Sequence, residues 1–248
     1  MLDDMMHHRV EEASLNAWPA LRQMIYDGWL LRFADGYTKR ANSVTPLNRS
    51  SIDLDTKIAY CEQVYRRNGL PCIFRLPSFT VPELDQLLDQ RGYTLVDPTL
   101  VLYRDLRTCF APLTTYLRNE PLDRWLDTFC QLSETSRDRY TTHYMILECI
   151  AGQRMLNTLW IEDTAVACGM AVMEADLVGL FDILTAPEQR RRSYATQLIA
   201  GILLQAQVYG ATHAYLQVTE ANTAARHLYA KLGFEELYRY WYRVAPAA

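Results

Sequence analysis

Two intervals of this sequence repeat the same order of secondary structure. Pro46 and Gly92 lie 46 residues apart, and so do Pro187 and Gly233. In both intervals the apolar pattern predicts a strand, an amphipathic helix, a second strand and a second helix that ends at the glycine. A matched order over a matched span indicates a duplicated unit. The chain is therefore expected to be an α/β protein in which strands and helices alternate through both copies.

The periodicity of apolar residues gives approximate bounds for the elements of each copy. The first copy is predicted to contain the strand Asn42–Leu47, a helix around Ile58–Tyr65, the strand Cys72–Leu76, the helix Val81–Arg91 and the strand Thr94–Leu106. The second copy is predicted to contain the strand Gly179–Thr185, a helix around Leu198–Ala206, the strand His213–Val218, the helix Thr223–Leu232 and the strand Glu236–Val244.

The segments outside the two copies complete the predicted organisation. Asp35-Gly36, a dipeptide typical of tight hairpin turns, is expected to join strands at Tyr26–Ala34 and Tyr37–Ser43. A linker is predicted near Thr108–Asn119. It is followed by predicted helices at Leu122–Ser133 and Ser136–Ile150, and then by predicted strands at Met155–Ile161 and Val166–Met173. This order predicts an N-terminal domain over residues 1–110 and a C-terminal domain over residues 111–248.

Composition argues against several classes of protein. The 248 residues carry a net charge of −4, whereas general nucleic-acid binding requires a basic surface, so no nucleic-acid partner is expected. No apolar run is long enough to span a bilayer, and the acidic N-terminus does not resemble a secretory signal. No membrane association is therefore expected. The cysteines show no C-x-x-C pair and no zinc-finger spacing, which predicts reduced thiols in a cytoplasmic protein without a metal site. The six cysteines are Cys61, Cys72, Cys109, Cys130, Cys149 and Cys168.

Arginines and small residues occupy the loop between the first strand and the first helix of the second copy. The segment reads Arg190-Arg-Arg-Ser-Tyr-Ala195. Backbone N–H groups at the start of a helix, together with the positive end of the helix dipole, form a binding site for phosphate groups. The segment therefore indicates a site for the pyrophosphate of a nucleotide-like cofactor. The alternative interpretation is a solvated, arginine-rich loop.

A second segment is predicted to form a helix closed by glycine. It reads Asn222-Thr-Ala-Ala-Arg-His-Leu-Tyr-Ala-Lys-Leu-Gly-Phe234. Spacings of four and three residues place Asn222, Arg226 and Tyr229 on one face of this helix. Such a face can close over the other end of the same cofactor.

Together the two segments resemble the acetyl-coenzyme A signature of the GCN5-related N-acetyltransferases. The family's phosphate loop, Gln/Arg-x-x-Gly-x-Gly/Ala, falls on residues 190–195, and its motif Asn-x-x-Ala-x-x-Leu-Tyr-x-x-x-Gly-Phe matches residues 222–234 at every named position. Ser193 is one departure, because the family usually has glycine there and a Cβ narrows the approach of the backbone to phosphate. The resemblance covers about Leu122 to Val244 and implies a mixed, mostly antiparallel sheet flanked by helices.

The first copy is expected to be a degenerate half-domain of the same type that precedes the complete one. In place of the basic loop it carries Asn48–Asp55, with two acidic residues and one arginine. Carboxylates near a pyrophosphate would repel it, so this copy is not expected to hold the coenzyme.

The resemblance implies direct transfer of an acetyl group from acetyl-CoA to a primary amine of a small molecule or peptide, in a ternary complex and without metal. The expected partners are acetyl-CoA and the amine acceptor, and a homodimer is a further candidate assembly. The residues assigned to the coenzyme are Ile183, Leu184, Thr185, Arg190, Arg191, Arg192, Ser193, Tyr194, Ala195, Thr196, Asn222, Arg226 and Tyr229.

Two interpretations of Tyr229 remain open at the level of sequence. The resemblance implies that its hydroxyl protonates the departing thiolate, which is reasonable chemistry for a phenol with a pKa of about 10. The alternative is an aromatic side chain that packs against the sheet.

The sequence does not identify the general base. Many family members have a glutamate early in the strand before the phosphate loop, eleven residues before the position of Arg190, where this chain has Gly179. The nearby carboxylates are Glu174, Asp182 and Glu220, of which Asp182 and Glu174 are the catalytic candidates that we retain. Strand alternation turns Asp182 away from Ile183 unless a bulge intervenes, as it often does in this family. His143 is expected to be a packed histidine.

Two other functions fit the same motifs. A non-catalytic acyl-CoA-binding regulatory protein would keep the coenzyme loop and lack an acceptor base, and Gly179 is consistent with that. A protein-interaction module would use both halves only to build a dimer surface.

Overall fold

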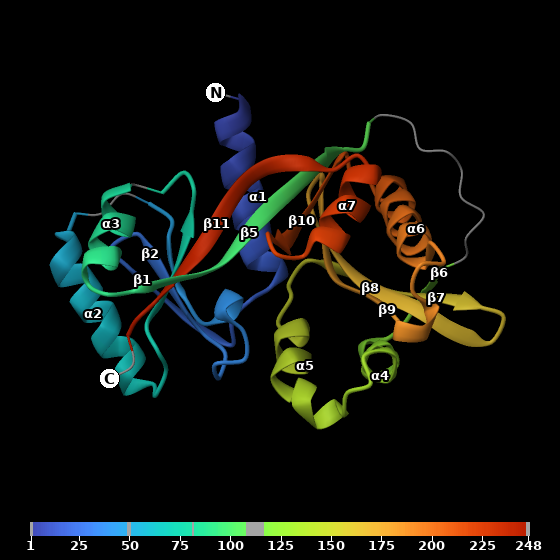
Figure 1. Ribbon diagram of the computed structural model, residues 1–248, viewed down its shortest axis with the longest axis horizontal. Helices are drawn as coiled ribbons and strands as arrows, with labels where there is room; N and C mark the ends of the chain where they lie inside the picture. Colours follow the sequence, from blue (N-terminus) through green and yellow to red (C-terminus); the bar gives the residue numbers. More distant parts are fainter. Residues whose placement is uncertain (1, 49–50, 81, 108–116, 247–248) are drawn as a thin grey trace. The chain divides into compact units, whose positions relative to one another are not determined.

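The computed structural model describes residues 2–48, 51–80, 82–107 and 117–246 (Figure 1). The chain divides into two compact units that are not consecutive stretches of sequence. Unit 1 comprises residues 1–17, 101–218 and 222–237, and unit 2 comprises residues 18–100, 219–221 and 238–248. The two units are therefore not divided at the sequence boundary expected at residue 110. The N-terminal helix belongs to unit 1, and the last residues of the C-terminal strand belong to unit 2.

Unit 2 is a small sheet whose core is completed by two helices. Its elements are β1 (Arg22–Tyr26), β2 (Trp29–Phe33), the 3₁₀ helix η1 (Lys39–Ala41), β3 (Val44–Pro46), α2 (Leu54–Arg67), β4 (Ile73–Pro77), α3 (Pro82–Gln90), the first part of β5 (Thr94–Asp105) and the last part of β11 (Glu235–Val244). The strand order is β1-β2-β3-β4-β11, in which only β3 and β4 are parallel among the described pairs. Residues of α2 and α3, such as Ile58 and Leu84, pack in one core with Trp29 and Phe74 of the strands.

The prediction of a hairpin at Asp35-Gly36 is wrong. The hairpin joins β1 to β2 through Asp27-Gly28, with φ angles of 43° and 80°. A two-residue turn of this handedness matches the twist of the strands that it joins. Asp35 and Gly36 also have positive φ, but they begin a loop in which the Asn42 side chain accepts hydrogen bonds from the N–H groups of Ala34 and Gly36. The sequence offered two Asp-Gly pairs, and these side-chain bonds distinguish them.

Unit 1 contains the strands and helices around the predicted coenzyme loop. Its elements are α1 (Leu2–Ala17), β6 (Leu117–Asn119), α4 (Leu122–Leu132), η2 (Arg137–Tyr140), α5 (Thr141–Glu148), β7 (Gln153–Ile161), β8 (Thr164–Glu174), β9 (Leu177–Thr185), η3 (Pro187–Gln189), α6 (Tyr194–Val208), β10 (His213–Thr219), α7 (Thr223–Lys231) and the remaining parts of β5 and β11. The strand order is β5-β10-β9-β8-β7-β6, with β9 and β10 parallel and β6–β9 antiparallel. Helices α4 and α5 lie on one side of β7–β9, and α6 lies on the other (Figure 1).

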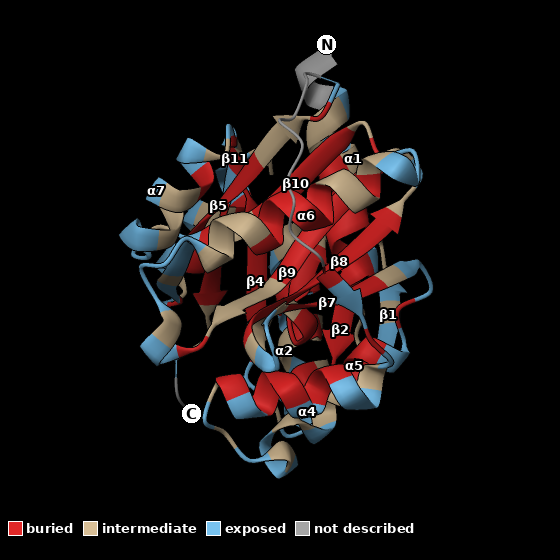
Figure 2. Ribbon diagram, turned by 90° about the vertical axis from the view of Figure 1, so that its right-hand side faces the viewer, coloured by how far each residue is buried: buried red, intermediate tan, exposed pale blue. Residues whose placement is uncertain are grey.

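The expected fold class, a mixed and mostly antiparallel sheet flanked by helices, is confirmed. The order of elements in the two copies is also confirmed: β3-α2-β4-α3-β5 corresponds to β9-α6-β10-α7-β11. In each copy the first helix connects two parallel strands, β3 with β4 and β9 with β10. Figure 2 shows many buried residues of unit 1 on the strands β8, β9 and β10 and on the helices α4 and α6.

Helix α1 was not predicted, although Val10 and Ala13, three residues apart, are both buried. The linker expected near Thr108–Asn119 falls largely on residues 108–116, which lie outside the described residues, and its last three residues form β6. Val81 and Cys109 also lie outside the described residues. The five cysteines that the structure describes are free thiols. Within the described ranges no helix could cross a membrane, and no cluster of side chains is suited to a metal ion.

Candidate active site

Strand β9 has a neighbour on both sides over only part of its length. Leu177–Leu180 pair in parallel with His213–Leu216 of β10, whereas the antiparallel pairing with β8 continues to Thr185. Within the described part of the chain, the edge of residues 181–185 that faces away from β8 therefore has no strand paired to it. Ile183, Leu184 and Thr185, predicted to run beside the coenzyme, lie in this stretch. An extended ligand can add to such an edge through backbone hydrogen bonds.

The loop that follows β9 has the backbone geometry of an anion site. After η3, Arg191 and Ser193 adopt left-handed conformations with φ of 61° and 62°, and Ser193 is the N-cap residue of α6. Successive N–H groups in turn conformations can form a concavity that suits anions. The N–H of Gln197 bonds to the Ser193 carbonyl, so Tyr194–Thr196 form the first helical turn. The N–H groups of a first helical turn have no carbonyl acceptor four residues earlier, so they make no hydrogen bond within the helix.

The side chains of this loop are open to solvent. Arg190, Arg191, Arg192 and Ser193 are exposed, and the three residues that follow are half-buried. Three guanidinium groups beside the N-terminus of a helix give the loop a positive potential. The structure thus brings together every residue predicted for the pyrophosphate.

The predicted face of α7 runs from solvent to the interior. Asn222 is exposed, and its side-chain oxygen caps the helix by accepting a hydrogen bond from the Ala225 N–H. Arg226 is half-buried, and Tyr229 is 8% exposed. The Tyr229 ring lies edge-on to Phe234, with the ring centroids 6.0 Å apart. Burial raises the pKa of Tyr229 to about 12. The ring therefore packs in the interior, as the second interpretation of this residue requires.

A bulge interrupts β9 at Asp182. Cys168 pairs with Leu184 and Met170 with Phe181, so two residue steps on β8 lie opposite three on β9. The extra residue bends the strand and changes the direction of its side chains. Asp182 has φ of 51°, a conformation that costs a non-glycine residue energy and that is common at functional sites.

The bulge brings the Asp182 carboxylate to His143 of α5. The Oδ2 atom of Asp182 lies 3.0 Å from Nε2 of His143. His143 is 2% exposed, and the Asp182 side chain is 19% exposed. The expectation that His143 is buried is confirmed, but its carboxylate neighbour was not foreseen. No local pattern signals this pair, because 39 residues separate the two positions in the chain.

Gly179 is a glycine because Tyr215 occupies the adjacent space. The two residues are directly paired between β9 and β10, and a Cβ on Gly179 would lie 2.5 Å from Cζ and from the hydroxyl oxygen of Tyr215. It would also lie 2.7 Å from the Phe181 ring. A glutamate has no room at this position. The absence of the family's usual base thus reflects packing at the β9–β10 pair.

A Gly179→Ala variant is expected to be less stable than the wild type by about 1–3 kcal/mol, the usual cost of overpacking. Chemical denaturation monitored by circular dichroism measures this difference. The double variant Gly179→Ala, Tyr215→Leu should recover part of the loss, because leucine has no atoms where the tyrosine ring ends. Unchanged stability of Gly179→Ala would contradict the packing argument.

Of the other carboxylate candidates, Glu174 lies at the end of β9 opposite to the loop. Glu174 ends β8 and accepts hydrogen bonds of 3.2 and 3.0 Å from the Asn16 side chain. It pairs with Leu177 at the far end of β9, roughly 25 Å along the strand from Thr185. Glu220 belongs to unit 2 and lies 3.3 Å from Arg239. Of the three carboxylates, only Asp182 is on the segment of β9 next to the coenzyme loop.

The equivalent loop of the first copy is occupied by a carboxylate of the chain itself. Asp27 accepts hydrogen bonds from the N–H groups of Ser51 and Ile52 and from the Ser51 hydroxyl, at 2.7–3.1 Å. The buried Lys57 ammonium lies 3.2 Å from Asp27 Oδ2 and 4.0 Å from the centroid of the Trp29 ring. The Asp27 carboxylate thus accepts hydrogen bonds from backbone N–H groups that precede α2. This agrees with the expectation that the first copy does not hold the coenzyme.

An Asp27→Asn variant is expected to lower the stability of the protein by about 1–3 kcal/mol. Asparagine keeps the turn conformation but removes the charge beside the buried Lys57. Thermal unfolding measures the effect. Asp35→Asn is the matched control, since Asp35 also precedes glycine with positive φ, at 51°, and is exposed. Equal stability of the two variants would contradict a structural role for the Asp27 charge.

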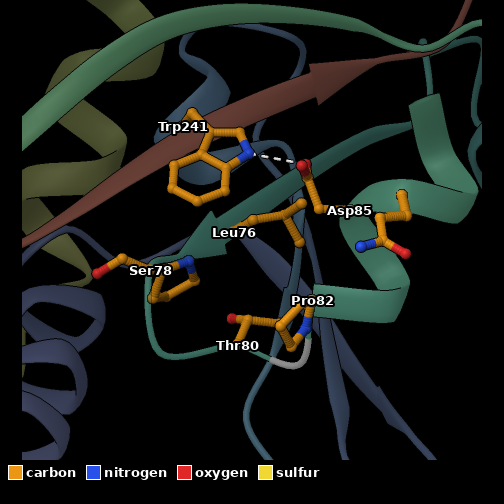
Figure 3. Close-up of a pocket in the computed structure, with 8 residues that line it drawn as sticks. Leu76, Ser78, Thr80, Pro82, Asp85 and Trp241 are labelled. Atoms are coloured by element: carbon orange, nitrogen blue, oxygen red, sulfur yellow. Dashed lines mark hydrogen bonds between the residues drawn. The ribbon is translucent and has the colours of Figure 1, made fainter.

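Unit 2 contains a separate pocket of about 210 Å³, lined by Leu76, Pro82, Asp85 and Trp241 among others (Figure 3). The Asp85 carboxylate accepts hydrogen bonds of 2.8 Å from the indole of Trp241 and from Arg243. Burial alone would raise the pKa of Asp85, but these bonds hold it below its usual value. The carboxylate therefore ties β11 to α3, and no residue predicted for the coenzyme lines this pocket.

Comparison with known proteins places this arrangement in one family. The family model described as "Probable histone acetyltransferase Rv0428c C-terminal" matches residues 7–243. The "Uncharacterized N-acetyltransferase YobR" of Bacillus subtilis is 29% identical over 250 residues, covering 98% of this chain and 99% of the relative. The "Probable histone acetyltransferase Rv0428c" of Mycobacterium tuberculosis is 28% identical, covering 91% of this chain and 69% of the relative.

Solved structures share the fold. A GCN5-related N-acetyltransferase from Kribbella flavida superimposes with a TM-score of 0.71 at 15% identity, covering 97% of this chain and 96% of the other. A tandem GNAT protein from the clavulanic acid biosynthesis pathway gives a TM-score of 0.59 at 12% identity, covering 77% of this chain and 69% of the other. The likeness extends over both units.

Proposed function

Since this chain belongs to the Rv0428c C-terminal family of GCN5-related N-acetyltransferases, we propose that it transfers an acetyl group from acetyl-CoA directly to a primary amine. The protein is an N-acetyltransferase; the donor, the acceptor class and the direct route in a ternary complex are the proposed parts. The acceptor is a small molecule or a peptide. The first copy is proposed to be a degenerate half-domain, with residues 111–248 forming the catalytic domain.

The observation that carries this proposal is the loop between β9 and α6. Arg191 and Ser193 are left-handed and lie at the N-terminus of α6, in a loop that carries three exposed arginines. Preorganised amides and positive charge are what a diphosphate requires. The open edge of residues 181–185 continues from this loop and gives the pantetheine arm a backbone to pair with. An N–H of this edge would polarise the acetyl carbonyl.

Each of the remaining assigned residues has a proposed role. Asn222 and Arg226 are proposed to contact the coenzyme from α7, and the Tyr229 hydroxyl to donate to the sulfur as the thioester breaks. Asp182 is the proposed base. Glu174, at the other end of β9, has a weaker claim to that role because of its distance along the strand.

Thiol release from acetyl-CoA in the presence of an amine panel tests the proposal. The panel should contain alkylamines, a polyamine, amino acids and a lysine-rich peptide, the last because a relative is described as a "Probable histone acetyltransferase". Mass spectrometry of the acceptor should show a gain of one acetyl group. Transfer to none of these amines, with CoA still bound, would favour the non-catalytic acyl-CoA-binding alternative, which Gly179 in place of a glutamate supports.

A further inference from the structure

We propose that Asp182 and His143 act together as the proton acceptor for the attacking amine, with Asp182 touching the amine and His143 positioning the carboxylate. This inference rests on the acetyl transfer proposed above. It assigns a role to a helix residue that lies outside both coenzyme motifs.

The conformation of Asp182 is the first observation. An aspartate at φ of 51° inside a strand persists only where the surroundings favour it. Ile183, the next residue, points to the α6 side, where its Cδ1 atom lies 2.6 Å from the position that a Cβ on Gly169 would take. The bulge thus sends Ile183 toward α6 and leaves the Asp182 carboxylate beside α5.

The environment of His143 is the second observation. Its ring lies edge-on to Phe129 at 5.8 Å and tilted to Tyr140 at 5.5 Å, measured between ring centroids. These two aromatic rings restrict the imidazole, and Nε2 remains 3.0 Å from the carboxylate. Because Asp182 is the more exposed member, an amine arriving from solvent would meet the carboxylate first. The imidazole behind it holds the carboxylate in position.

Cys168 and Glu120 are further titratable groups in this part of unit 1. The Cys168 thiol of β8 is buried, and burial together with the charges of Asp182, Glu120 and Cys130 raises its pKa, so that it stays protonated. Glu120 is 8% exposed and accepts a hydrogen bond from Thr158. Its nearest described cation is Arg124, at 3.9 Å, whose side chain is largely exposed. The carboxylates of Asp182 and Glu120 attract a cationic ammonium group.

The proton balance of the step is complete without another reactant. The acceptor ammonium gives one proton to the pair, and its freed lone pair attacks the acetyl carbonyl carbon. The C–N bond forms and the C–S bond breaks. The second proton of the amine goes to the coenzyme thiolate, giving an amide and a free thiol. The pair then releases its proton to water.

The test compares the variants Asp182→Asn and His143→Gln with His213→Gln. The control, His213, is another buried histidine of unit 1, bonded to the Tyr103 hydroxyl at 2.6 Å and remote from β9 residues 181–185 in the strand register. For each protein, kcat/KM is measured from pH 5.5 to pH 9.5 with the best alkylamine of the panel and with the O-alkylhydroxylamine of the same skeleton. The O-alkylhydroxylamine is already unprotonated at pH 7, so no base has to remove a proton before it attacks. Thermal unfolding and CoA binding are measured in parallel.

At pH 7 both pair variants should lose about 100-fold or more in kcat/KM with the alkylamine, the usual contribution of a general base, and less than about 10-fold with the O-alkylhydroxylamine. The acidic limb of the alkylamine profile should move in His143→Gln, because the group beside the Asp182 carboxylate has changed. His213→Gln should stay within about 3-fold of wild type for both acceptors.

Equal losses with both acceptors, or an unmoved acidic limb, would overturn the proposal. If His143→Gln does not fold, His143→Asn and Asp182→Asn decide the question by the same ratio of losses. Wild-type protein that acetylates none of the acceptors would refute the proposed function. Wild-type transfer with fully active pair variants would refute only the role of the pair.

Discussion

A Ser193→Val variant is expected to bind CoA at least about 10-fold more weakly than wild type, and Ser193→Gly is expected to bind it more tightly. Ser193 has φ of 62°, where a β-branched residue is most strained and glycine is unstrained. The left-handed conformation costs an L-residue about 1–2 kcal/mol. Valine would therefore move the loop out of the conformation that aims its amides. Restoring the wild-type loop conformation on binding would lower the affinity for CoA about 10-fold.

Isothermal titration with CoA measures these affinities. Ser193→Ala is the matched control, because it keeps a Cβ and removes only the hydroxyl; a fall in its affinity would assign binding to the hydroxyl instead. If valine, alanine and glycine at this position bind CoA equally, the loop does not hold the diphosphate. The same result would remove the main support for the proposed reaction.

A Tyr229→Phe variant is expected to lower kcat by about 100-fold while CoA affinity stays nearly unchanged. Phenylalanine keeps the packing against Phe234 and removes only the hydroxyl. The raised pKa of about 12 keeps Tyr229 protonated throughout the range in which the enzyme is assayed. Such a phenol is a weaker acid than a thiol, whose pKa is near 8.5, so we expect it to stabilise the developing thiolate mainly as a hydrogen-bond donor.

The pH profile supplies a second measurement for Tyr229. Since its folded-state pKa lies near 12, loss of its proton should produce no alkaline limb below about pH 11. Tyr103→Phe is the control, because the Tyr103 hydroxyl bonds to His213 and not to the predicted coenzyme face. If the Tyr229→Phe variant has the kcat of the wild type, the Tyr229 hydroxyl has no role in catalysis. The side chain then only packs in the interior, which agrees with its 8% exposure.

Local patterns were sufficient for most of the secondary structure. The helix Thr223–Leu232 was predicted within one residue of α7, since Asn222 is an N-cap signal and Gly233 a C-terminal one. The strand Gly179–Thr185 was found two residues short of β9. The hairpin failed because Asp27-Gly28 and Asp35-Gly36 are equivalent as dipeptides. Distant partners, Asn42 among them, decide which pair closes a hairpin.

The amino-acid sequence by itself determined the element order, the duplicated pattern and the coenzyme motifs, because these depend on residues close together in the chain. Only the tertiary structure decided that Asp182 meets His143, that Tyr215 fills the space beside Gly179, and that Asp27 occupies the loop of the first copy. Each of these depends on a bulge, a strand register or a turn that joins distant segments. Such choices are made by packing and hydrogen bonding between elements, which no spacing within one element encodes.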